Sequence, residues 1–180
     1  ASAADLSVFT AAVKQPLAGK AQFTGTVSGT ITQPKIHLEG ASPNLSVAGT
    51  SVRDLTLSTD LADLAAPNGT VTGRARVSGM DSTLQTALRL QDGVLTFSNA
   101  ALRAGTTDIN GAIAITLKTT AVTADLTIDS SDLSPWSALA EVPLKGRARA
   151  KLTLKPDGSA AGDGTASSLS IGEVNIADLR

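Results

Sequence analysis

Residues 17–31 read LAGKAQFTGTVSGTI, with an apolar or small residue at every odd position and a polar residue at nearly every even one. Alternation with a period of two predicts a β-strand that has one apolar and one polar face. The segment is long for a strand of a globular protein. The sequence therefore predicts an extended, two-faced strand at this point of the chain.

The same alternation returns in five later segments, 71–77, 84–90, 109–117, 122–128 and 144–154. Turn signals separate the segments, and they are Gln33-Pro34, Ser42-Pro43-Asn44, Gln91-Asp92-Gly93, Ala104-Gly105 and Lys155-Pro156-Asp157-Gly158. Short connections favour antiparallel pairing of neighbouring strands. We expect about a dozen strands in an all-β antiparallel meander.

Three short segments depart from this pattern and have helical spacing instead, at residues 7–13, 60–66 and 134–140. The first contains Phe9 and the last contains Trp136, the single tryptophan. In the last segment Ser134 is a candidate capping residue and Pro135 fits the first helical position. The sequence thus predicts a few short helices among the strands.

An internal repeat links the first and last of these segments. Asp5–Ser7 and Pro16–Ala21 match Asp132–Ser134 and Pro143–Ala148 at one constant offset, which also aligns the two aromatic residues. A weaker third copy begins at Asp60. We interpret residues 1–180 as one fragment of a repetitive β-domain, with repeat starts near residues 5, 60 and 132.

Composition excludes several classes of function. The formal net charge is -1, aromatic residues make up 2% of the chain, and there is no cysteine. A balanced charge and few aromatic side chains argue against binding to nucleic acid or to sugars. The lack of cysteine excludes disulfides and thiolate zinc sites.

Candidate catalytic and metal-binding residues are isolated. His37 is the single histidine, and alternation places it on the polar face, where we expect a structural role. Asp125 and Asp129 share a face about 13 Å apart, too far for a catalytic carboxylate pair. Residues 162–164, Gly-Asp-Gly, lack the period of calcium-binding repeats. We therefore expect no enzyme activity, no catalytic or metal-binding residue and no cofactor.

The repeated pattern resembles the periplasmic repeats of the TamB and AsmA-like family. It consists of Asp-Leu-Ser, a short apolar helix, Pro-Leu-x-Gly-Lys/Arg-Ala and an alternating strand. The resemblance implies a long β-sheet curled into a half-pipe with an apolar interior. It also implies a periplasmic location, in a protein anchored in the inner membrane of a Gram-negative cell. The implied partners are phospholipid acyl chains, a TamA-like outer-membrane assembly protein and client β-barrel proteins. This chain would be an internal slice of such a protein.

In that half-pipe, the apolar residues of the alternating segments would line a lipid groove. They are Leu17, Phe23, Val27, Ile31, Val71, Val77, Leu84, Leu88, Leu90, Ile109, Ile113, Ile115, Leu117, Val122, Leu126, Ile128, Leu144, Leu152 and Leu154. Inward glycines would permit the sheet to coil. Three helical stubs are too few to build a second layer over so many strands, so the sheet must fold onto itself.

Two questions stay open at this stage. Arg74, Arg76, Arg147, Arg149 and Lys151 form basic stripes, which either pair with Asp125 and Asp129 across strands or contact anionic headgroups. The alternative to a transport and assembly scaffold is an extracellular structural or adhesive β-protein, whose strands would stack around a dry core. A cavity wide enough for an acyl chain would distinguish the two functions.

Overall fold

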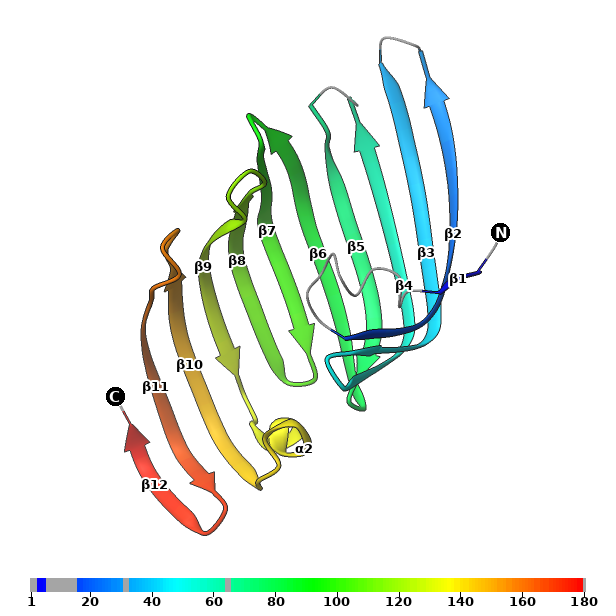
Figure 1. Ribbon diagram of the computed structural model, residues 1–180. Coiled ribbons are helices and arrows are strands. Elements are labelled where there is room, and N and C mark those ends of the chain that lie inside the picture. The colour runs from blue at the N-terminus through cyan, green and yellow to red at the C-terminus, as the bar shows by residue number, and fades with distance from the viewer. Residues whose placement is uncertain (1–2, 6–15, 31–32, 64–65, 180) are drawn as a thin grey trace.

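A computed structural model describes residues 3–5, 16–30, 33–63 and 66–179 of the chain (Figure 1). The described residues form one sheet of twelve strands, in which every strand lies beside its neighbour in sequence. All the pairings are antiparallel. The predicted all-β meander is confirmed.

The strands follow one another with little else between them. They are β1 (Ala3–Asp5), β2 (Leu17–Gly29), β3 (Pro34–Val47), β4 (Thr50–Ala62), β5 (Asn68–Val77), β6 (Met80–Gln91), β7 (Val94–Ala104), β8 (Thr107–Thr116), β9 (Ala121–Ser130), β10 (Leu144–Leu154), β11 (Ala160–Ile171) and β12 (Val174–Leu179). A short 3-10 helix, η2 (Ser134–Trp136), and a single helical turn, α2 (Ser137–Ala140), lie between β9 and β10.

The predicted helices have different outcomes. The one expected at 134–140 is confirmed as η2 and α2. The one expected at 60–66 is wrong for Asp60–Ala62, which continue β4 because each pairs with a residue of both β3 and β5. The segment 7–13, which contains Phe9, lies outside the described residues.

The strand register gathers the apolar side chains on one face of the sheet. One rung of directly opposed residues crosses nine strands through Val27, Ile36, Leu61, Gly69, Leu88, Phe97, Ile113, Ala124 and Leu154. Residues two apart on a strand share a face. Parallel rungs therefore lie beside this one on the same face, and one of them includes Thr59 and Thr86. We call this surface the apolar face and the opposite surface the polar face.

Register shifts interrupt the pairing in five of the strand pairs of the sheet. They fall in the pairs β2–β3, β6–β7 and β10–β11, which are spaced four strands apart, and also in β4–β5 and β7–β8. Asp54, Asn99 and Ser168 lie beside these shifts with left-handed backbone, at φ of 52°, 50° and 52°. An extra residue on one strand bends that strand and strengthens its local twist. Ser42-Pro43-Asn44, predicted as a turn, is one of these bulges within β3.

The half-pipe expected from the sequence is not formed by these residues. The two end strands, β1 and β12, are not paired with each other, and the sheet is open and twisted without strong curling (Figure 1). The strands bend along their length, most visibly at one end of β2, β3 and β4. These bends do not curl the sheet into a half-pipe (Figure 1). Twist alone therefore shapes most of the sheet.

Candidate functional site: an uncovered apolar face

The predicted groove residues whose side chains the structure describes within strands share the apolar face. Opposed pairs include Ile115 with Val122, Ile109 with Ile128, and Leu126 with Leu152. Leu84 and Leu88 lie on the same face of β6. Leu117 directly follows β8, and Ile31 lies outside the described residues. The structure thus brings residues from β2, β5, β6, β8, β9 and β10 onto one continuous surface.

This face has little cover. The buried hydrophobic residues in the described part of the chain are Ala21, Met80, Ala104, Ala124 and Leu169. Phe23, Val27 and Leu117 are 54%, 74% and 50% exposed. The whole chain exposes 11670 Å², whereas a compact monomer of its mass would expose about 8,100 Å². The apolar face is therefore open to whatever surrounds the molecule.

Sequence reasoning missed residues of this face on β3, β4 and β7. They are Ile36, Leu57, Leu61, Leu95, Phe97 and Leu102, whose partners in the register are residues of the predicted set or glycines. On β7 the inward residues are odd-numbered up to Phe97 and even-numbered from Ala100 onward, because Asn99 is the extra residue of a bulge. A change of phase in an otherwise regular alternation is the signal that would have revealed them.

The described residues carry one helical cover on the apolar face, formed by η2 and α2. Trp136 Nε1 donates a hydrogen bond to Thr107 Oγ1 at 2.7 Å, and that hydroxyl donates to Ser130 Oγ at 2.8 Å. Thr107 and Ser130 are directly opposed on β8 and β9 and are 3% and 2% exposed. Every polar atom of this cluster therefore has a partner, as burial requires. The helix closes one end of the face, over β8 and β9.

The predicted capping role of Ser134 is wrong, because Leu133 occupies the N-cap position, without a side-chain hydrogen bond, and Asp132 instead binds Ser134. Its Oδ1 accepts a hydrogen bond from the Ser134 backbone N–H at 2.9 Å, and its Oδ2 accepts one from Ser134 Oγ at 2.6 Å. The hydroxyl of Ser134 thus donates to the carboxylate of Asp132 and does not accept from a backbone N–H of the helix. Both hydrogen bonds favour the ionised carboxylate and lower the pKa of Asp132, with the side-chain bond contributing most.

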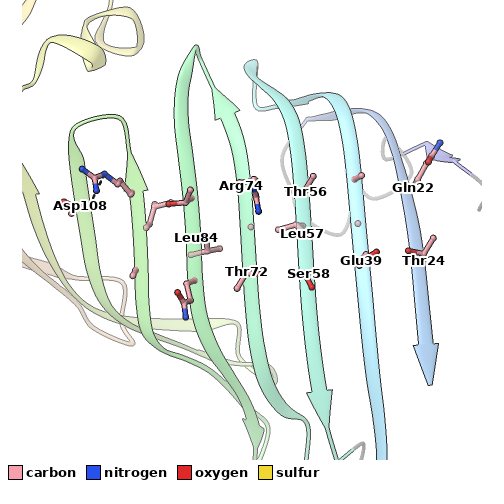
Figure 2. Close-up of a pocket in the computed structure, with 18 of the residues that line it drawn as sticks. Gln22, Thr24, Glu39, Thr56, Leu57, Ser58, Thr72, Arg74, Leu84 and Asp108 are labelled. Carbon is pink, nitrogen blue, oxygen red and sulfur yellow. Dashed lines mark ion pairs between the residues drawn. The ribbon is translucent and has the colours of Figure 1, made fainter. Parts of the chain in front are cut away.

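A hollow lies on the opposite, polar face of the described residues. Its volume is about 890 Å³, and it extends from β2 to β8. Thr24, Glu39, Ser58 and Thr72 line it as directly opposed neighbours, and Arg74 lies beside them (Figure 2). A smaller hollow between β8 and β10 is lined by residues of the same face, such as Asn110 and Thr127. Most residues that line the first hollow belong to the polar face, and Leu57, Leu84 and Leu102 line it as well.

Several ion pairs lie on the polar face. Arg149 Nε lies 2.8 Å from Asp129 Oδ2. This ion pair agrees with the first interpretation of the basic stripes, in which they pair with aspartates across strands. Asp125 differs, because its Oδ1 accepts a hydrogen bond from Thr153 Oγ1 at 2.9 Å. Arg76 pairs with Asp81, across the β5–β6 hairpin, at 2.9 Å. These exposed pairs contribute little individually to stability.

His37 lies on the polar face, where the sequence predicts it. Its Nδ1 lies 2.7 Å from Asp60 Oδ1 and its Nε2 lies 3.5 Å from Glu39 Oε1. The hydrogen bond to Asp60, followed by that to Glu39, stabilises the imidazolium and raises the pKa of His37. Both ring nitrogens therefore face carboxylates, an arrangement that favours the protonated imidazolium of His37 in a structural role.

The described part of the chain contains neither a metal-binding cluster nor a membrane-spanning helix. Among those residues, no group of three or more histidine, cysteine or carboxylate side chains could hold a metal ion. Within the same ranges, no helix is long and apolar enough to cross a membrane. In comparisons with protein-family models, with characterised proteins and with solved structures, no match was found. The function must accordingly be argued from the geometry.

Proposed function

We propose that the apolar face binds the acyl chains of phospholipids, and that the chain acts as a non-enzymatic scaffold in a bacterial cell envelope. The observation that carries the proposal is the uncovered apolar face itself. Isolated apolar side chains on a surface are ordinary, but a large contiguous apolar surface indicates an interaction with a partner or a lipid.

The chemistry of the face suits a chain of methylenes. The rung that runs from Val27 to Leu154 is aliphatic apart from Gly69 and Phe97, and every member is uncharged. An acyl chain of about 15 methylenes gains on the order of 12 kcal/mol on leaving water. The gain is similar at each point of a uniform surface, so a bound chain could move along the rungs at little cost.

The resemblance to the TamB and AsmA-like family extends the proposal to a biological setting. In that setting the chain lies in the periplasm, as part of a protein anchored in the inner membrane. It carries phospholipid between the membranes or assists the assembly of outer-membrane proteins, together with a TamA-like partner and client β-barrels. Curling of the sheet into a half-pipe around its lipid belongs to the same proposal, since burial on both sides would add to the gain.

Mass spectrometry of organic extracts from the purified protein tests the proposal. We expect phospholipid to copurify, and to be lost from a variant with Ile113→Arg on the apolar face, because a charge there opposes burial of an acyl chain. Asn110→Arg, on the polar face of the same strand, is the matched control and should retain lipid.

Two results would contradict lipid binding. One is an extract free of lipid from protein that proteolysis shows to be folded. The other is a second copy of the chain packed on the apolar face in solution, which would favour the structural or adhesive alternative, with a dry core between two sheets.

A further inference from the structure

The hollow on the polar face has an exposed arginine at its centre that makes no ion pair within the described part of the chain. Arg74, on β5, lines the hollow, and its directly opposed neighbours are Thr56 on β4 and Thr83 on β6. Three other arginines of this face each have an aspartate partner, and they are Arg76, Arg103 and Arg149. A guanidinium presents five N–H donors, so Arg74 has donors to offer to a ligand.

Five polar side chains of β4, β5 and β6 lie around this guanidinium, and none of them makes a side-chain hydrogen bond within the described residues. They are Thr56, Ser58, Thr72, Thr83 and Gln85, which all line the hollow. Figure 2 shows Arg74 beside Thr56, with Thr72 one rung further along β5. Elsewhere on this face, Thr127 and Thr153 donate to other groups of the sheet. The centre of the hollow is therefore a set of free donors around one positive charge.

The carboxylates that line the hollow lie towards its two ends. Glu39 is on β3, with Oε1 3.5 Å from His37 Nε2, and Asp108 is on β8, with Oδ1 3.7 Å from Arg103 Nε. Asp108 lies three strands from Arg74, and Glu39 lies two strands and one rung away, which are separations of about 14 and 12 Å. Exposed charges so far apart are largely screened at physiological ionic strength, where the Debye length is about 8 Å. The centre of the hollow therefore keeps a positive charge.

The next rung adds to the positive potential. Arg53 and Arg76 are directly opposed on β4 and β5, and like charges in this position oppose pairing of the strands. Arg76 pairs with Asp81 at 2.9 Å, and Asp54 lies in the adjoining register shift with φ of 52°. Bulges are frequent beside binding sites, where they redirect side chains. Three arginines with Arg74 thus lie among two aspartates, and an anion beside Arg74 would reduce their repulsion.

We propose that the centre of this hollow binds the phosphate group of a small soluble molecule, with Arg74 as the cationic contact and the hydroxyl and carboxamide groups around it as hydrogen-bond donors. A phosphate presents several acceptor oxygens at once, which suits donors that converge from three strands on one charge. The sheet lies between this hollow and the apolar face, so a phospholipid with its acyl chains on the apolar face does not place its headgroup here. The proposal goes beyond lipid binding and does not rest on it.

An NMR titration with inorganic phosphate, at constant ionic strength, tests the proposal. We expect saturable shifts of the Arg74 Nε–H signal and of the amides around it on β4, β5 and β6. Arg74→Gln should weaken binding at least about tenfold, because it removes charge-assisted hydrogen bonds. Arg89→Gln, on the polar face of β6 but outside the hollow, is the matched control and should leave the affinity unchanged. Both arginines are exposed, so neither substitution should disturb the fold.

Three outcomes would overturn the proposal. One is the absence of a saturable shift around Arg74, and another is equal weakening by Arg74→Gln and Arg89→Gln, which would mean that phosphate responds only to the overall charge. The third is binding to phosphatidylglycerol vesicles without binding of inorganic phosphate, which would identify a membrane surface as the partner. The lipid content of Arg74→Gln, measured in organic extracts, separates these outcomes from a failure of the lipid proposal, which expects that content to be unchanged.

Discussion

At the scale of single residues, Trp136 joins the one helical cover to the sheet. Sequence spacing predicts that it plugs apolar surface, and the structure adds the hydrogen bond from Nε1 to Thr107, a residue of no obvious interest in the sequence. That contact depends on the pairing of Thr107 with Ser130, which are far apart in sequence. The local sequence pattern therefore predicted the helix. Its hydrogen bond to Thr107 could be identified only from the register of the sheet.

Replacement of Trp136 should destabilise the fold in two separable steps. The side chain is partly buried, so Trp136→Ala should cost about 2 to 3 kcal/mol, less than a fully buried aromatic. Trp136→Phe removes mainly the hydrogen bond and should cost about 1 kcal/mol. Leu139→Ala, 40% exposed on α2, is the control and should cost less than about 0.5 kcal/mol. Urea unfolding measures all three, and equal stability of Trp136→Ala and the unchanged protein would contradict the packing described above.

His37 should titrate above its ordinary value of 6.5, and Asp60→Asn should lower that pKa. A raised pKa means that the ion pair stabilises the fold below about pH 6.5 and that this contribution is lost as the pH rises through the folded value. Since His37 is the single histidine, its imidazole signals in proton NMR report the titration directly. A pKa below 6.5, or one that Asp60→Asn leaves unchanged, would show that the pair does not form in solution.

At the scale of elements, strands without a bulge were predicted from the alternation of the sequence, whereas strands with a bulge were missed. Alternation located β2, β5, β6, β8, β9 and β10, whose inward residues keep one parity. It failed on β4 and β7, where an extra residue reverses the parity part-way, at Asp54 and Asn99. A period-of-two pattern assumes one residue per pleat, so each bulge divides a long strand into two short signals.

The bulge of β10 and β11 should depend on the absence of a side chain at Gly146. Gly146 has φ +113°, and a Cβ there would lie 2.6 Å from Ser168 O and 2.9 Å from Leu169 Cα. Gly79 has φ +86° with no atom within 4 Å of an added Cβ, so it controls for backbone strain alone. We expect Gly79→Ala to cost about 1 kcal/mol and Gly146→Ala at least about 2 kcal/mol in thermal or urea unfolding. Equal costs would mean that the facing strand moves away freely.

At the scale of the whole molecule, the residues that the structure describes do not form the second layer that normally buries an apolar face. Composition and alternation predicted the meander and its two faces. They could not predict the curvature, because curvature depends on where bulges fall and how the twist of twelve strands adds up. The half-pipe was an inference from a family resemblance, and the open sheet corrects it for the described residues.

If the apolar face carries lipid, capture should depend on the face and not on position along the chain. A photo-crosslinker at Val27, Ile113 or Leu126 should capture phospholipid in cells, whereas one at Thr26 or Asp125 should not. The two sets alternate on the same strands, β2, β8 and β9. Mass spectrometry of the adducts provides the measurement. Equal capture on both faces would leave a scaffold that does not conduct lipid.

The four-strand spacing of the bulges has a consequence for size. Neighbouring strands lie about 4.8 Å apart, so each group of four adds about 19 Å to the width of the sheet. Because the β2–β3, β6–β7 and β10–β11 pairs carry their bends at that interval, a group could be duplicated or removed while the junctions on either side keep their register. The width of the sheet would then change in whole increments of about 19 Å, the width of four strands.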